Sequence, residues 1–180
     1  EGWKLFNITL LTERLAVLSH PAVNRNVLEP LIDLGRRTPG PDGRMLIEDG
    51  GFRRELADYY ALIAAVGQFQ SALLEAMCRG QAPGAEASIG KLAMAKPLQR
   101  MAARLMDLAG PAGAIADGQD AVIAEAQESF FWATIYRIAG GADEIMLNLV
   151  SEQMLGMARE ARADKDVPFN QLSQTGAASV

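Results

Sequence analysis

The sequence predicts an all-α fold, an up-and-down bundle of about five helices. Apolar residues recur at steps of three and four residues through most of the chain, which is the spacing of one helix face. Runs of alternating β-branched residues with hairpin turns do not occur. Gly- and Pro-rich breaks separate the helical stretches, and short breaks of this kind join helices that pack as antiparallel neighbours.

The length, net charge and apolar runs of the sequence limit the classes of protein to which the chain can belong. The chain has 180 residues, and we expect a bundle domain over 1–162 and an extended or disordered tail over 163–180. The net charge of −5 argues against nucleic-acid binding. Charged residues interrupt the longest apolar runs, so we expect no transmembrane span.

The sequence contains few residues that could bind a metal ion or form a disulfide. Cys78 is the single cysteine, which excludes a disulfide framework and a thiolate metal site. His20 is the single histidine, which rules out paired Glu-x-x-His di-iron sites. The chain starts at Glu1 without Met and opens with no secretory signal, so it reads as a fragment or a processed chain.

The first predicted helix covers residues 2–19. Phe6, Leu10, Glu13 and Val17 follow one another at helical spacing, so a carboxylate interrupts an otherwise apolar line. Glu13 is either a solvated residue at the edge of the stripe or a partly buried residue with a chemical role.

A loop with many Gly and Pro residues covers residues 35–51. Five arginines lie in it or just beyond it: Arg36, Arg37, Arg44, Arg53 and Arg54. They form either a solvated basic loop or an anion site, because guanidinium groups suit phosphate oxygens.

Three further helices are predicted over residues 51–79, 85–109 and 119–138, with breaks at the glycines and prolines between them. Phe52, Ile63 and Val66 mark the buried face of the first of the three. In the second, we expect Lys91 and Lys96 to lie at the surface with their charged ends in water.

The last predicted helix follows Gly140 and Gly141 and ends near Glu160. Asp143 and Glu144 fall in its first turn, where negative charge is favoured. From the residues alone, this stretch is a loop, a helix start and a buried helix, with Leu147 and Met154 on its apolar face.

The same stretch resembles the C-terminal signature of the acyl-CoA dehydrogenases. The similar segment reads YRIAGGADEIMLNLVSEQMLGMARE. Other segments resemble the family too, namely Glu1-Gly2-Trp3-Lys4, Ile47 to Tyr59, Leu105 to Ile115 and Glu160 to Phe169. The N-terminal helical and middle β domains of the family have no counterpart here. The resemblance therefore implies the C-terminal domain of a longer protein.

The resemblance implies an FAD-dependent oxidoreductase that desaturates an acyl-CoA thioester between its α and β carbons. A glutamate removes the α proton, and the β hydrogen leaves as hydride. Many members place this glutamate just before the glycine of the turn, where this chain has Gly140. Others supply it from the first helix, in a context similar to Leu11-Thr12-Glu13-Arg14-Leu15. The resemblance thus implies Glu13 as the general base, with Arg14 in support.

The resemblance also implies contacts with FAD, which the family binds between subunits. They fall on Arg36, Arg37, Gly110, Gly113, Gly141, Ala142 and Glu144. Two departures from the family pattern affect them. Ala142 replaces the usual Thr, and the arginine loop lacks the family's Phe-Gly.

Two functions therefore remain open. One is the C-terminal domain of an acyl-CoA dehydrogenase, with an electron-transfer flavoprotein or a similar acceptor as redox partner. The other is a non-catalytic partner subunit or assembly scaffold with the same bundle. Either would form a homo- or hetero-oligomer through this domain, in the cytoplasm of a bacterium.

Overall fold

The computed structural model describes residues 2, 5, 6, 8–10, 12, 13, 28–81, 84–115 and 120–159. In these ranges the regular structure is helical, and the only β pairing is an isolated bridge between Pro39 and Met45. The described part of the chain confirms the all-α prediction.

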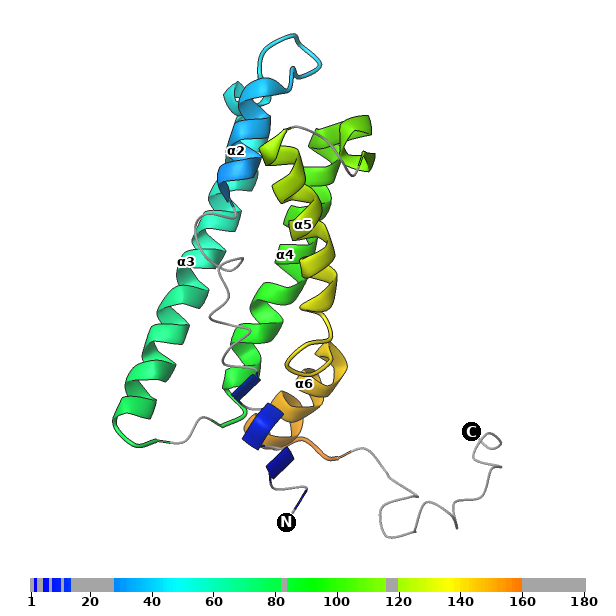
Figure 1. Ribbon diagram of the computed structural model, residues 1–180. Coiled ribbons are helices and arrows are strands. Elements are labelled where there is room, and N and C mark those ends of the chain that lie inside the picture. Colours follow the sequence, from blue (N-terminus) through cyan, green and yellow to red (C-terminus); the bar gives the residue numbers. More distant parts are fainter. Residues whose placement is uncertain are drawn as a thin grey trace, which may run out of the picture.

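The helices run up and down as a bundle. Figure 1 shows helices α2, α3, α4 and α5 lying side by side, with the short helix α6 at one end. The elements are α2 (Leu28–Arg37), η3 (Leu46–Glu48), α3 (Gly50–Cys78), α4 (Ala87–Ala109), η4 (Gly110–Ala114), α5 (Ala121–Ile135), α6 (Asp143–Leu149) and η5 (Val150–Met154).

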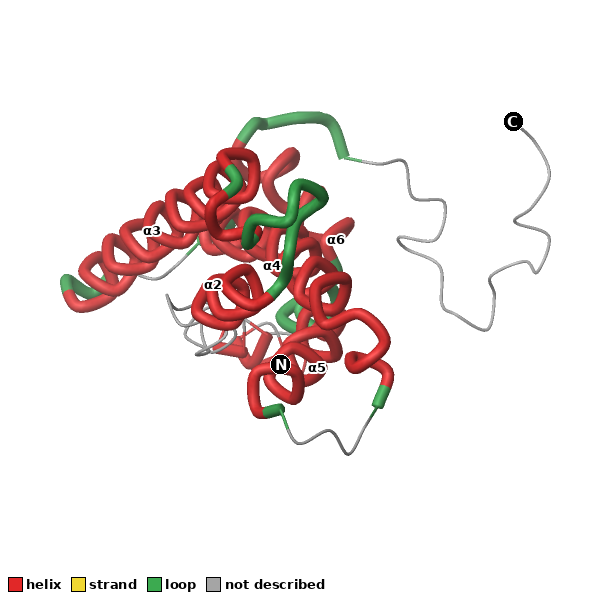
Figure 2. Tube along the Cα trace, turned by 90° about the horizontal axis from the view of Figure 1, so that it is seen from above, coloured by secondary structure: helices red, strands yellow, loops and turns green. Residues whose placement is uncertain are grey.

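Helix α4 is the centre of the bundle. It packs against α2, α3, α5 and α6, and the view along the bundle shows it between them (Figure 2). Its buried face repeats at steps of three and four residues, through Met94, Leu98, Met101 and Leu105. Leu31 of α2 joins this core. The core therefore follows the length of α4.

Aspartates fix the starts of two helices. Asp49 accepts a hydrogen bond from the Phe52 amide at 2.8 Å at the start of α3. Asp120 accepts one from the Val122 amide at 3.0 Å at the start of α5. Each carboxylate satisfies an N–H that has no partner within its own helix. Helices α3, α4 and α5 begin and end within three residues of their predicted bounds.

The last helix differs from its prediction. Helix α6 ends at Leu149 and continues only as the π-helical turn η5, so the expected helix to Glu160 is wrong over Leu155–Arg159. Glu160 lies outside the described residues. The predicted apolar face is also wrong, because Leu147 and Met154 are exposed and Met146 is buried.

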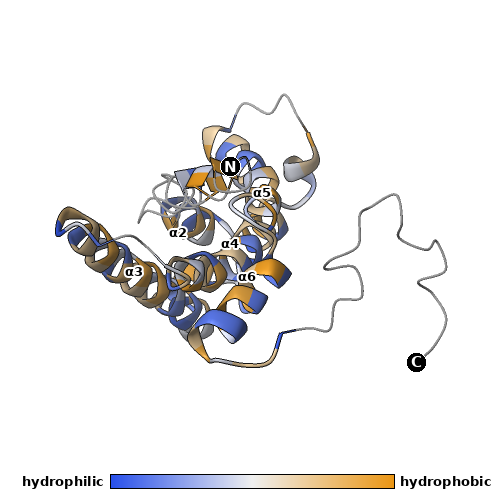
Figure 3. Cartoon of the chain, turned by 90° about the horizontal axis from the view of Figure 1, so that it is seen from below, coloured by the Kyte–Doolittle hydropathy of each residue, from blue (hydrophilic) through white to orange (hydrophobic). Residues whose placement is uncertain are grey.

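Large apolar side chains remain exposed on α5 and α6. They include Phe130, Phe131, Trp132, Ile135, Ile145 and Leu147. Figure 3 shows apolar stretches in orange on the outside of the bundle around α6. Helix α5 is rich in apolar residues and does not separate them onto a single face.

One described helix passes a simple test for a membrane span. Helix α3 contains an 18-residue window with a mean hydropathy of 1.4, and 17% of that window is buried in the bundle. Length and composition alone give this result, and they do the same for core helices of bundles. The expected absence of a span stays a prediction.

We expect Gly35→Ala to destabilise the protein. Gly35 is buried in α2 against the Phe52 ring, and a Cβ at this position would overlap ring carbons. Overpacking of this kind costs about 1–3 kcal/mol. The matched control is Gly67→Ala in α3, where a Cβ meets no atom within 4 Å, so the variant gains up to about 1 kcal/mol of helix propensity. Urea unfolding of both variants measures the two changes, and equal midpoints would contradict the prediction.

Candidate functional site

The Gly140–Gly141 turn joins α5 to α6. Gly140 has a φ of +70° and Gly141 a φ of +109°, so both lie in the left-handed region that favours glycine. The Gly141 amide donates to the carbonyl of Ile138 at 3.1 Å, which closes the turn. The prediction of a glycine break before the last helix is confirmed.

Glu13 reaches this turn from the other end of the sequence. Its Oε1 accepts a hydrogen bond from the Gly140 amide at 3.1 Å. The Glu13 side chain is exposed. The structure thus places it at the edge of its helix in contact with water, as one of the two interpretations expects, and adds a backbone contact that the sequence does not predict. Arg14 lies outside the described residues.

A buried ion cluster lies behind the turn. The Lys91 ammonium donates to Asp143 Oδ1 at 2.5 Å and to the Arg137 carbonyl at 3.1 Å. The Arg137 guanidinium pairs with Asp143 Oδ2 through Nε and donates to Gln99 Oε1 at 2.8 Å through Nη1. Lys91 is 1% exposed and Asp143 is 2% exposed. The expected surface position of Lys91 is therefore wrong, while Lys96 is exposed as predicted.

Charge neutralisation explains why Lys91 is inside. Burial of an unpaired ammonium group costs a great deal of free energy, so a buried lysine needs an anion in contact. The sequence contained one signal: Lys91 falls on the line of Ala87, Met94 and Leu98, which are buried at helical spacing. Its anion, Asp143, is 52 residues away and has no local pattern that points to Lys91.

The ion cluster sets the protonation of Asp143. Burial raises the pKa of this carboxyl, but the hydrogen bonds and charges of Lys91 and Arg137 outweigh that effect and hold the pKa below its ordinary value. Asp143 is therefore ionised at neutral pH and can neutralise one of its two cationic neighbours.

Three of the predicted flavin contacts lie in the turn or directly after it. Gly141 is half-buried, Glu144 is exposed, and Ala142 is the residue that precedes the first turn of α6. Ala142 makes no capping hydrogen bond through its side chain, since it has no hydroxyl. The structure brings these residues next to Glu13, through the Gly140 contact.

The remaining predicted contacts lie at the opposite end of the bundle. Arg36 and Arg37 end α2, and Gly110 and Gly113 lie in the turn after α4 (Figure 1). At 1.5 Å per residue, α4 carries the chain about 28 Å from Lys91 to Gly110. The structure therefore does not bring the predicted flavin contacts into one site.

Three of the arginines at that end pair with carboxylates. Arg37 pairs with Asp120 at 2.7 Å, and Arg36 lies 3.7 Å from Asp33. Arg44 pairs with Asp42 at 2.6 Å. The aspartates satisfy much of the anion-binding capacity of these side chains, which favours the solvated basic loop over the anion site.

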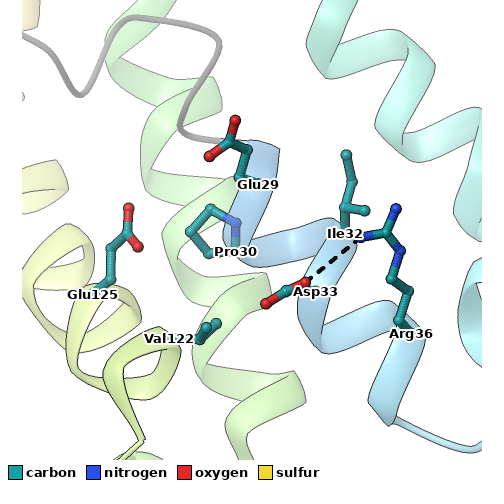
Figure 4. Close-up of a pocket in the computed structure, with 7 residues that line it drawn as sticks. All are labelled: Glu29, Pro30, Ile32, Asp33, Arg36, Val122 and Glu125. Atoms are coloured by element: carbon teal, nitrogen blue, oxygen red, sulfur yellow. Dashed lines mark ion pairs between the residues drawn. The ribbon is translucent and has the colours of Figure 1, made fainter.

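A cleft beside Arg36 is acidic. Glu29 and Asp33 of α2 face Glu125 of α5 across it, with Val122 and Pro30 among its other walls (Figure 4). Burial, followed by repulsion from Glu29 and Glu128, raises the pKa of Glu125. Three carboxylates and one arginine, Arg36, line this cleft, and the excess of negative charge disfavours a phosphate group. Among the described residues, no group of three His, Cys, Asp or Glu side chains could hold a metal ion.

The sequence matches one family over most of its length. The sequence profile of the acyl-CoA dehydrogenase C-terminal domain matches residues 1–155. Acyl-CoA dehydrogenase IpdE1 of Mycobacterium tuberculosis is 28% identical over 164 residues, which cover 90% of this chain and 40% of IpdE1. Acyl-CoA dehydrogenase FadE34 of the same organism is 29% identical over 159 residues, which cover 88% of this chain and 20% of FadE34.

Solved structures share the fold. A chain of the ChsE4–ChsE5 complex from Mycobacterium tuberculosis superposes with a TM-score of 0.70 at 21% identity, over 88% of this chain and 42% of that one. Butyryl-CoA dehydrogenase from Megasphaera elsdenii gives a TM-score of 0.69 at 19% identity, over 86% of this chain and 39% of that one. The chain thus spans less than half the length of each of these relatives.

We expect Asp143→Asn to remove a pH-dependent part of the stability. The folded pKa of Asp143 is below its unfolded value, so its stabilisation is complete above about pH 4 and is lost as the pH falls through the folded pKa. At pH 7 the variant leaves Lys91 buried beside a neutral amide, which costs about 3–5 kcal/mol. Urea unfolding at several pH values measures the difference from the wild-type protein. The difference should shrink at pH 3, and a constant difference would contradict this account.

Proposed function

Because this chain belongs to the acyl-CoA dehydrogenase family, whose C-terminal domain it matches over residues 1–155, we propose that it is the C-terminal helical domain of an FAD-dependent acyl-CoA dehydrogenase. Such an enzyme desaturates an acyl-CoA thioester between the α and β carbons. In this proposal the chain supplies the base, and the rest of the site comes from other domains or subunits.

The observation that carries the proposal is the hydrogen bond from the Gly140 amide to Glu13. By resemblance, the base of such an enzyme comes either from the position before the glycine of the turn or from the first helix. In this chain the position before the glycine of the turn is Gly140, and the first-helix position is Glu13. Because the Gly140 amide donates to the Glu13 carboxylate, the two alternative positions of the base lie next to each other. A base supplied by Glu13 can therefore reach the same substrate carbon as a base carried by the turn.

The contact of the Glu13 carboxylate supports its proposed role as the base. The Gly140 amide donates to Oε1, and in this proposal Oε2 accepts the α proton of the substrate. The side chain is exposed, so a thioester can approach it. A backbone donor also fixes the direction of the carboxylate before the substrate binds, which lowers the entropy cost of reaction.

In this proposal the flavin lies at the turn and not at the arginine loop. Gly140 is buried, so the cofactor would border the half-buried Gly141 and the exposed Glu144. Arg36 and Arg37 are paired with carboxylates and stand at the far end of the bundle. FAD, when bound, supplies the acceptor for the hydride of the β carbon. Gly141, Ala142 and Glu144 would border it.

The exposed side chains of α5 support association with other protein surface. Phe131 in α5 is 69% exposed, and Trp132 and Ile135 of the same helix are exposed as well. Ile138, which follows α5, is also 69% exposed. An apolar surface of this kind is typical of interfaces. We therefore propose that α5 and α6 pack against other domains or subunits, in a homo- or hetero-oligomer. An electron-transfer flavoprotein or a similar acceptor would reoxidise the cofactor.

A second candidate function is a non-catalytic partner subunit with the same bundle. The paired arginines and the missing hydroxyl of Ala142 favour it, because both weaken the contacts that a flavin would make with this chain. The flavin content of the native protein separates the two functions. One FAD for each copy of this chain supports the enzyme, and an oligomer with this chain in excess over FAD supports the partner subunit.

We expect Glu13→Gln to abolish acyl-CoA oxidation in the native protein. The amide keeps an oxygen for the Gly140 N–H, so the fold stays intact, but it cannot accept a proton. Loss of a general base lowers kcat by about 100-fold or more. Turnover is measured with straight-chain, branched and ring-bearing acyl-CoA esters and an artificial electron acceptor.

The control for this variant is Glu48→Gln. Glu48 is exposed in η3, at the end of the bundle away from the Gly140–Gly141 turn, and this change should leave kcat as it is in the wild-type protein. Near-normal acyl-CoA oxidation by Glu13→Gln would contradict the assignment of Glu13 as the base.

A further inference from the structure

The ion cluster of Lys91, Arg137 and Asp143 closes a loop of the chain. Arg137 precedes the Gly140–Gly141 turn and Asp143 follows it, and the two side chains pair across it. Lys91 contacts both sides as well, through the Arg137 carbonyl and the Asp143 carboxylate. The five residues of the turn are therefore held at both ends by one cluster.

Helix α4 anchors this cluster in the core. Lys91 is buried in α4 between Ala87 and Met94, and Gln99 on the same helix accepts from Arg137. The position of the turn is thus tied to the most buried helix of the bundle and does not depend on α5 and α6 alone.

The turn needs such an anchor because of its glycines. Glycine has more conformational freedom than any other residue, so two in succession make a loose connection unless something else fixes the backbone. Gly140 lies at the middle of the closed loop, and its amide is the group that contacts Glu13. Freedom in the turn would move this amide away from the Glu13 carboxylate.

Stability alone is a weak reason for a buried ion cluster. Apolar side chains of the same volume often stabilise a core as well as or better than a buried ion pair, because the ions lose their hydration. The directed hydrogen bonds of Lys91 and Arg137 instead select one conformation of the residues that they hold.

We propose that Lys91, Arg137 and Asp143 are positioning residues that hold the Gly140 amide in place against the Glu13 carboxylate. None of the three touches substrate in this proposal. They act through the backbone of the turn. The geometric part of the inference stands on the contacts of this chain, and its effect on turnover rests on the proposed function.

The test compares Lys91→Met with Lys96→Met in the native protein. Methionine keeps the unbranched apolar stem of lysine and removes the ammonium group. Lys96 is exposed on the same helix, so its variant controls for the loss of one positive charge from α4. Hydrogen exchange with mass spectrometry, read on peptides that cover residues 137–146, measures how often the turn opens.

We expect exchange at the turn to be about tenfold faster or more in Lys91→Met, with unchanged exchange in Lys96→Met. In the same variant, kcat should fall about ten- to hundredfold while KM stays within about twofold, because a misplaced base affects the reaction more than binding. Gln99→Leu removes only the hydrogen bond from Arg137 to Gln99 and should give a smaller rise in exchange. This second variant tests the proposal if Lys91→Met does not fold.

Two results would overturn the proposal. The first is exchange at residues 137–146 that does not change in Lys91→Met. The second is a rise of equal size in peptides from α3 and α5, which would indicate a general loss of stability. A fully active Glu13→Gln protein together with a loosened turn in Lys91→Met would remove the proposed base and leave the positioning of the turn intact.

Discussion

The contact between Lys91 and Asp143 is the constraint on which the end of the bundle depends. A lysine inside the core has to meet an anion, and the anion that it meets begins another helix. The contact joins the first turn of α6 to α4, and the hydrogen bond from Lys91 to the Arg137 carbonyl joins the end of the α5 segment to the same side chain. Arg137 adds a second cation and ties the same carboxylate to the chain before the turn. The contact spans 52 residues of sequence, and the Arg37–Asp120 and Glu13–Gly140 contacts span 83 and 127 residues.

The predicted flavin contacts form two groups, which lie at opposite ends of helix α4. Glu13 and the glycine turn lie at one end of it, and Arg36, Arg37 and Gly110 lie at the other. A straight helix cannot shorten this separation, so no side-chain rearrangement brings the two groups together. The exposed large apolar side chains of α5 lie in its C-terminal half, on the side of the glycine turn.

The fold could be predicted from the sequence because its information is local. Helical periodicity, aspartate caps and glycine breaks all lie within a few residues of the structure that they determine, as at Asp49 and Asp120. The candidate site could be predicted only in part. Glu13 and the turn were visible as separate features, but their contact joins residues 127 positions apart. Lys91 was misassigned for the same reason, since lysine prefers the surface unless a distant partner neutralises it.

The π-helical turn after α6 limits how far helical spacing predicts burial in this segment. In η5 the Leu155 amide reaches back five residues to the Val150 carbonyl, where an α-helix would reach back four. A turn of this width departs from the three- and four-residue steps that place side chains on one face of an α-helix. The spacing rule therefore holds only as far as Leu149, where the α-helix ends. Met154, which lies beyond that point, is exposed.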